Sequence, residues 1–177
     1  MRFTLFAVVA IAACASTPSP DTTAAPRAQT IRAEGLGSIT VAPVTDASKA
    51  VLSSPIEDVW MQMPAVYDSL GIPKTLIDTK RYLISSQGFK IRQRLGRTPL
   101  SRFIDCGQTQ IGQNADSYDV YLTVTSQLRT DPPRTILSST VEAMAKPLSF
   151  NQEYSRCSSR GLLESRIADA TKSRLPR

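Results

Sequence analysis

The chain has 177 residues, 41% hydrophobic and 6% aromatic, a composition typical of one globular domain with unfolded segments attached. Its 21 Lys and Arg residues against 15 Asp and Glu give a net charge of +6. Histidine is absent, which excludes Ser-His-Asp and Cys-His catalysis, histidine-ligated zinc and a histidine general base.

Residues 1–13 have the form of an export signal, because Arg2 is followed by an apolar run that ends in small residues. The run is too short to span a bilayer, which takes about 20 residues. The sequence Ile11-Ala12-Ala13-Cys14 resembles the lipobox of bacterial lipoproteins. The resemblance implies that residues 1–13 are removed and that lipidated Cys14 anchors the chain to a membrane. An ordinary cleavage site followed by a stray cysteine is the alternative.

Residues 14–36 are expected to form the lipidated cysteine and a disordered tether. They are rich in Ala, Ser, Thr and Pro, and their large apolar residues are Ile31 and Leu36 alone, so they cannot bury enough surface to fold. By the sorting convention of Gram-negative lipoproteins, Ala15 rather than Asp after Cys14 implies the outer membrane, facing the periplasm. The globular domain is then expected over residues 37–177.

Cys106 and Cys157 are left as an even pair in an exported protein, which predicts a disulfide. It would join the chain before Gly107 to the start of the last helix. A catalytic or redox thiol is the alternative, disfavoured because the spacing is not Cys-x-x-Cys and no histidine is present to form a thiolate.

The first helix is expected to begin at Ser54-Pro55-Ile56-Glu57, with Ser54 as N-cap, Pro55 at the first helical position and Glu57 closing a capping box. Gly71 ends it, and Pro64 is expected to kink it. Its apolar face is Val59, Met63, Val66 and Leu70. Trp60 and Tyr67 lie beside this face; core packing is the plain interpretation, and a ligand pocket is the alternative.

Short strands are predicted over 38–44, 49–52, 75–78 and 82–85. After Gly88 the chain alternates strictly between an apolar and a basic side. The first side holds Phe89, Ile91, Gln93 and Leu95, and the second holds Lys90, Arg92 and Arg94.

Residues 96–117 are expected to form a long ordered loop with a short strand or helical turn around 100–106. Residues 118–128 and 135–145 alternate apolar and polar residues and are joined through 129–134, which predicts an antiparallel pair. A polar loop then reaches Cys157, and a helix is predicted over 161–175. Its apolar face is Leu163, Ile167 and Ala170.

This order predicts a single α+β domain in which an antiparallel sheet packs on a long C-terminal helix. The block from Val51 to Trp60, the run Tyr67-Asp-Ser-Leu-Gly71 and the strand with Asp78 resemble the helix-grip domains of the BamC (NlpB) lipoprotein family. That family belongs to the outer-membrane β-barrel assembly machinery, so the resemblance implies a helix-grip fold and a part in outer-membrane assembly. It covers about residues 50–95. The chain departs from the family in having one domain instead of two and in its cysteine pair.

The chain has no Walker A loop, Gly-x-Gly-x-x-Gly, Gly-x-Ser-x-Gly or Ser-x-x-Lys motif. Asp116 and Asp119 could be a hydrolytic carboxylate pair or bind calcium, but Asp-x-x-Asp alone is common and has too few ligands, so turn or cap roles are expected. We therefore expect no catalytic residues, no metal and no cofactor.

Charge carries the most functional information. Eight basic residues lie between Lys74 and Arg102 against one acidic residue, Asp78. In an exported protein this predicts an anionic lipid or acidic protein partner rather than nucleic acid. Lys90, Arg92 and Arg94 form the candidate binding face; a solvated strand face, charged to prevent edge pairing, is the alternative.

The sequence thus predicts a non-enzymatic cell-envelope lipoprotein that binds another envelope protein. A module for a lipid or another anionic small ligand is the alternative, with a pocket between sheet and last helix lined by Trp60 and Tyr67.

Overall fold

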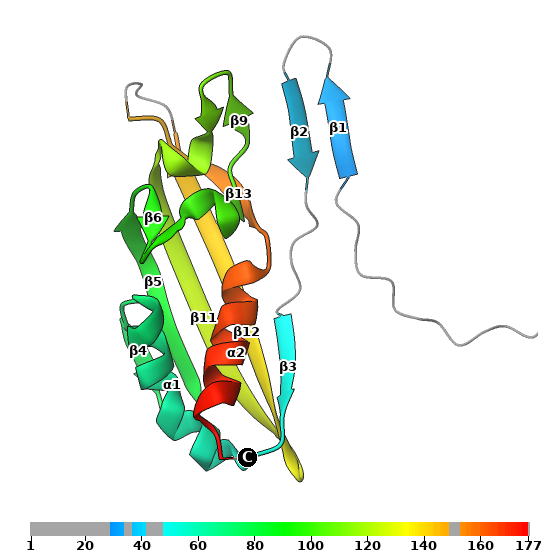
Figure 1. The fold of residues 1–177 in the computed structure, drawn as a ribbon, viewed down its shortest axis with the longest axis vertical. Coiled ribbons are helices and arrows are strands. Elements are labelled where there is room, and N and C mark those ends of the chain that lie inside the picture. Colours follow the sequence, from blue (N-terminus) through cyan, green and yellow to red (C-terminus); the bar gives the residue numbers. More distant parts are fainter. Residues whose placement is uncertain (1–28, 34–36, 42–47, 149–152, 177) are drawn as a thin grey trace, which may run out of the picture.

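The computed structural model describes residues 29–33, 37–41, 48–148 and 153–176 (Figure 1). The signal segment 1–13, Cys14 and most of the tether therefore lie outside the described residues. Within the predicted tether, β1 (Gln29–Ala33) is a strand and pairs antiparallel with β2 (Gly37–Val41), which covers the start of the strand predicted over 38–44. No helix in the described ranges has the length and apolar character needed to cross a membrane.

The chain from β3 onward is an α+β domain with two helices and a mostly antiparallel sheet. A seven-stranded sheet has the order β4-β5-β11-β12-β13-β8, and β3 also pairs with β12. Its elements are β3 (Ser48–Leu52), α1 (Ile56–Leu70), β4 (Leu76–Asp78), β5 (Leu83–Ile91), β8 (Ile104–Asp105), β11 (Asp119–Asp131), β12 (Arg134–Lys146), β13 (Ser155–Ser159) and α2 (Leu162–Arg174).

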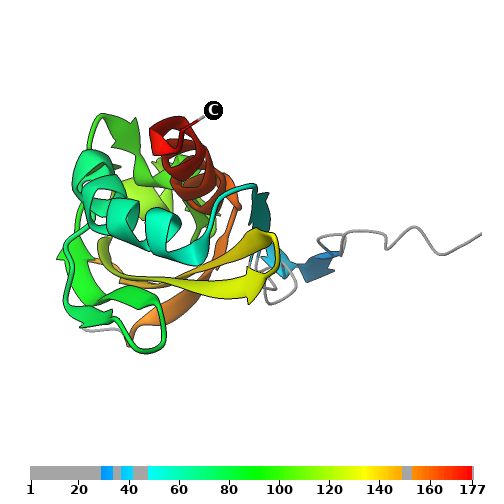
Figure 2. The same ribbon diagram turned by 90° about the horizontal axis from the view of Figure 1, so that it is seen from below.

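Both α-helices cover the same face of the sheet, and no helix of the described residues lies on the other face (Figures 1 and 2). We call these the covered face and the open face. The core lies between the helices and the covered face. Tyr67 of α1 ties the two layers together, because its buried hydroxyl donates to the Ile84 carbonyl at 3.2 Å and is hydrogen-bonded to Ser126 Oγ at 3.0 Å.

Helix α1 forms where the apolar spacing predicts it and ends at Gly71, whose φ of 70° is the left-handed conformation that glycine adopts without a Cβ penalty. The predicted start is wrong. Pro55 occupies the N-cap position and no side chain caps the helix. Instead, the Ser54 carbonyl accepts a hydrogen bond of 2.7 Å from Thr135 Oγ1, which ties the helix start to β12.

Strands β11 and β12 form the predicted antiparallel pair, but both are longer than expected. They run without a register break from Asp119↔Lys146 to Asp131↔Arg134, so the connection is only Pro132-Pro133. Val120, Leu122 and Val124 alternate onto the covered face and are fully buried.

Helix α2 forms where a helix was predicted over 161–175; it has 13 residues and is shorter than α1, which has 15. Its buried apolar positions Leu163 and Ile167 are as expected. The next position on this face is Thr171 rather than Ala170. Its hydroxyl donates to the Ile167 carbonyl at 2.7 Å, which satisfies the buried oxygen.

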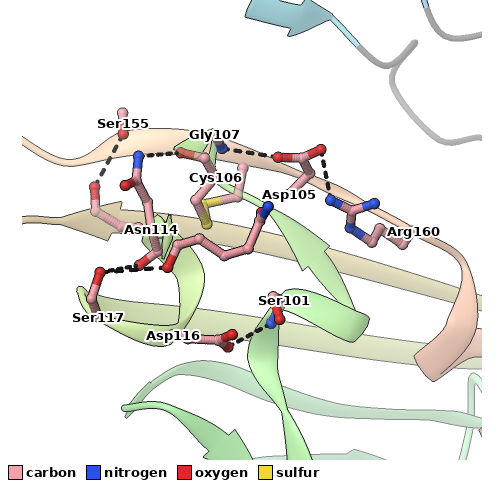
Figure 3. Close-up of a disulfide and its surroundings, with 12 residues drawn as sticks. Ser101, Asp105, Cys106, Gly107, Asn114, Asp116, Ser117, Ser155 and Arg160 are labelled. Atoms are coloured by element: carbon pink, nitrogen blue, oxygen red, sulfur yellow. Dashed lines mark hydrogen bonds and ion pairs between the residues drawn. A yellow bond between two sulfur atoms is a disulfide. The ribbon is translucent and has the colours of Figure 1, made fainter. Parts of the chain in front are cut away.

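The predicted loop 96–117 holds the expected helical turn and several short strands besides: β7 (Thr98–Pro99), η1 (Leu100–Arg102), β8, β9 (Gln108–Thr109), β10 (Gly112–Gln113) and η2 (Asn114–Asp116). The predicted disulfide between Cys106 and Cys157 fastens this region to β13 (Figure 3). Cys157 lies within β13, a strand that we did not predict, rather than at the start of the last helix.

Two further contacts support the same attachment. Arg160 pairs with Asp105 at 2.9 Å (Figure 3), and the Arg160 backbone amide donates to the Phe103 carbonyl at 2.8 Å. The segment that would otherwise be a long surface loop is therefore held against the sheet by one covalent and several polar links.

Candidate functional site

A β-bulge decides which basic side chains lie on the open face. The register between β5 and β11 shifts between Leu122 and Val124, where Gly88 has a φ of 56° and its amide donates to Thr123 Oγ1 at 3.0 Å. Because the bulge adds one residue to β5, Ile84 before it and Phe89 after it both face the core side. Lys90 is thereby placed on the open face.

Of the three basic residues predicted to share one strand face, Lys90 and Arg92 lie on the open face and Arg94 does not. Strand β5 ends at Ile91, and Gln93 has a φ of 60° in a tight turn whose closing hydrogen bond joins the Arg94 amide to the Arg92 carbonyl at 2.6 Å. Arg94 belongs to β6 (Arg94–Leu95), which pairs with β7 outside the main sheet. Strict alternation therefore stops before Gln93.

Lys90 is the first member of a row that crosses four strands on the open face. Cross-strand pairing places Tyr121 beside Lys90, Met144 beside Tyr121 and Arg156 beside Met144. Tyr121 is 37% exposed and Met144 is 44% exposed. The row is thus a cation, an aromatic ring, a thioether and a second cation, all accessible.

A second row lies beside the first. Asp119 pairs across the strands with Lys146, and its carboxylate binds Arg92 and, at 2.8 Å, Lys90. Lys146 Nζ lies 5.1 Å from the centre of the Tyr154 ring, a cation–π distance. We call these two rows the aromatic–basic cluster: Lys90, Tyr121, Met144, Arg156, Arg92, Asp119, Lys146 and Tyr154.

Electrostatic and aromatic contacts hold the aromatic–basic cluster in place. Hydrogen bonds from Arg92 and Lys90 lower the pKa of Asp119 from 3.8 to about 2, and the same contacts raise the pKa of both basic groups. Tyr154 packs edge-to-face on Tyr121 with ring centres 5.1 Å apart. Desolvation and the hydrogen bond with the Tyr121 hydroxyl raise the pKa of Tyr154, so its phenol stays neutral at physiological pH.

The middle of the open face is chemically different. Thr123, Thr125 and Gln127 of β11 and Ser138 and Thr140 of β12 replace the aromatic and thioether side chains there. Ser85 and Thr125 share a hydrogen bond of 2.9 Å across β5 and β11. Such residues satisfy one another and offer little apolar area to a partner, so the aromatic–basic cluster differs from the middle of this face in combining exposed apolar area with charge.

The two residues of the candidate pocket lie in or beside the core. Tyr67 is fully buried, and its hydroxyl is already bonded to Ile84 and Ser126. Burial raises the pKa of Tyr67 to about 12. Trp60 is half-buried and meets Tyr82 edge-on, with ring centres 5.8 Å apart. These contacts have a structural role in the domain.

The two aspartates considered for catalysis have separate structural partners. Asp116 accepts the Ser101 amide at 2.8 Å (Figure 3), whereas Asp119 binds Lys90 and Arg92. Within the described residues, no group of three or more Cys, Asp or Glu side chains is placed to hold a metal ion.

Glu164, in the first turn of α2, is a buried carboxylate that the sequence analysis did not single out. It is 2% exposed and accepts the Ser159 hydroxyl at 2.6 Å, while its Oε2 atom has no hydrogen-bond partner among the described residues. Burial raises the pKa of Glu164, opposed by hydrogen bonds from Ser159 and from the Val141 backbone. Val141 lies on β12 between the residues that pair with β3 and those that pair with β13, so Glu164 lies at this gap in pairing.

Of the aromatic–basic cluster, the sequence predicted Lys90 and Arg92 as binding residues. The residues it did not predict are Tyr121, Met144, Arg156, Lys146 and Tyr154. The available signal was that Tyr121 and Met144 fall on the polar side of two strongly patterned strands. The predicted connection 129–134 was too wide to set the register, and β13 was not predicted, so the row could not be assembled.

No family model matches the chain, and no curated protein matches it significantly.

Proposed function

We propose that this protein is a lipid-anchored, non-enzymatic module of the bacterial cell envelope that binds another envelope protein through the aromatic–basic cluster. The row Lys90, Tyr121, Met144 and Arg156 carries the proposal. Tyr, Met and Arg are enriched at protein interfaces, and here they lie exposed and side by side on a rigid sheet.

Three other features support this assignment. The Cys106–Cys157 disulfide fits an oxidising compartment outside the cytosol. The lipobox-like sequence before Cys14 supplies the anchor. An antiparallel sheet with its helices on one face is compatible with the helix-grip architecture, so the BamC-like resemblance extends the proposal to a role in outer-membrane protein assembly.

The test is in-cell crosslinking in the native host, followed by detergent extraction, affinity capture and mass spectrometry. We compare the wild type with Met144→Thr/Arg156→Glu and with the control Arg129→Glu, which makes the same charge change at the other end of the open face. Stoichiometric recovery of one envelope protein from wild type and control, lost in the cluster variant, is expected; recovery of β-barrel assembly components would establish the assembly role. Equal recovery from the cluster variant would overturn the proposal.

The intact mass of the membrane-extracted protein tests the anchor separately. We expect residues 1–13 to be absent, Cys14 to carry acyl chains and Cys106 and Cys157 to be oxidised. An unmodified Cys14 would contradict the lipoprotein assignment without affecting the binding surface.

A further inference from the structure

The first row of the aromatic–basic cluster has the length of a short extended peptide. Its members lie on four adjacent strands, so Lys90 and Arg156 are about 14 Å apart at the backbone, at about 4.8 Å per strand. An extended peptide advances about 3.3 Å per residue and presents every second side chain to the same side. Its residues i and i+4 are therefore about 13 Å apart and face the same way, with i+2 between them.

We propose, building on the protein-binding function above, that the row recognises an extended segment of an envelope protein with acidic residues at positions i and i+4 and an apolar residue at i+2. The two carboxylates pair with Lys90 and Arg156. The central side chain packs on Tyr121 and Met144, whose exposed apolar atoms lie between the cations.

Charge complementarity selects this occupant. The two rows hold four cations and one carboxylate, Asp119, which is already engaged by Lys90 and Arg92. Among the described residues, neither Lys146 nor Arg156 forms an ion pair. At Arg156 an acidic ligand thus gains a charge pair without displacing an existing one, whereas at Lys90 it shares the ammonium group with Asp119.

Glu142 restricts where the segment can lie. It faces the open side of β12, opposite Thr123 and two residues before Met144. An acidic peptide displaced into that neighbouring row would be repelled by its carboxylate. Glu142 thus disfavours the row on the Thr123 side of Met144 for an acidic segment.

The experiment measures fluorescence anisotropy of a labelled nine-residue peptide with Glu at positions 3 and 7 and Leu at position 5, titrated with detergent-purified full-length protein. The control peptide has the same composition with the second Glu moved to position 8, which turns it away from the sheet. We expect about tenfold weaker binding of the control peptide and about tenfold weaker binding by Arg156→Glu. Arg129→Glu, the same charge change elsewhere on the open face, should bind normally.

A charge swap makes the test specific. Arg156→Glu should regain affinity for a peptide with Lys in place of one Glu. Equal binding of both Glu peptides, or no loss in Arg156→Glu, would overturn the inference. Binding of a Cys14→Ser variant to vesicles containing anionic phospholipid, without peptide binding, would overturn it in favour of a lipid ligand. Failure of the peptide while the in-cell capture above succeeds would reject this motif alone, and failure of both would reject the proposed function.

Discussion

The two faces of the sheet are made by the same strands but have different chemistry. On β11, Leu122 points to the covered face and is fully buried, whereas its neighbour Tyr121 points to the open face and is 37% exposed. The covered face has apolar side chains packed under two helices; the open face has a hydroxyl-rich middle and the aromatic–basic cluster at one end. Alternate residues of one strand therefore have different roles. Those on the covered face stabilise the domain, and those on the open face are available for binding.

The largest expected effect on stability comes from removing the Cys106–Cys157 disulfide on the covered side. Replacing both cysteines, as Cys106→Ser/Cys157→Ser, should lower the free energy of unfolding by about 4 kcal/mol in the chain-entropy model, because the disulfide closes a loop with a sequence separation of 51 residues. Urea denaturation of the oxidised wild type and the variant measures this. A loss below about 1 kcal/mol would show that polar contacts such as Asp105–Arg160 hold this region by themselves.

A pair of adjacent substitutions tests the comparison directly. Leu122→Ala should cost about 3 kcal/mol of unfolding free energy, because it leaves a cavity under the helices. Tyr121→Ser, one residue away, should cost about 1 kcal/mol or less while abolishing partner capture. The same denaturation assay with the in-cell capture separates the two. Similar stability losses at both positions would contradict the division between the faces.

The buried Glu164 should make stability fall as pH rises. Burial raises its pKa in the folded protein, so the folded state favours the protonated form. Its favourable contribution is complete below the ordinary carboxyl pKa and is lost as the pH rises through the raised value. Glu164→Gln should remove this dependence, so that the variant gains stability relative to wild type as the pH rises above the ordinary carboxyl pKa. Parallel curves for the two proteins would refute the assignment.

On the open face the pH dependence should have the opposite sign. The folded pKa of Asp119 is about 2, below its ordinary 3.8, so its contribution is present above the ordinary value and is lost as the pH falls toward 2. Asp119→Asn should therefore be less stable than wild type at pH 7, and the deficit should shrink in acid. This change in stability should be the smallest of those predicted, because the side chains of Lys90 and Arg92 are exposed and solvent screens their attraction to Asp119. A deficit that is independent of pH would show that the carboxylate charge is not its cause.

Local patterns were sufficient for much of this fold. Leucine and valine alternation predicted the β11–β12 hairpin, and apolar spacing predicted α1 and the two buried positions of α2. The errors occurred where distant contacts override local signals. Thr135 binds the Ser54 carbonyl and the N-cap is Pro55, without a capping side chain.

The binding surface was only half predictable for a related reason. Lys90 and Arg92 were visible in the alternation, but the bulge at Gly88 and the tight turn at Gln93 change which residues follow them on the same face. Arg156 joins the row through β13, a polar strand without an apolar pattern that pairs with β12. Because β13 forms through its pairing with β12, its own sequence has no apolar alternation from which a strand could be predicted.

The most direct test of the central claim is site-specific photocrosslinking in living cells. A benzophenone amino acid replaces Tyr121 in the aromatic–basic cluster or, as a control on the same strand and face, Gln127 in the hydroxyl-rich region. We expect a discrete crosslinked envelope protein from position 121 and little or none from position 127. Crosslinks of equal yield at both positions, or from position 127 alone, would contradict it.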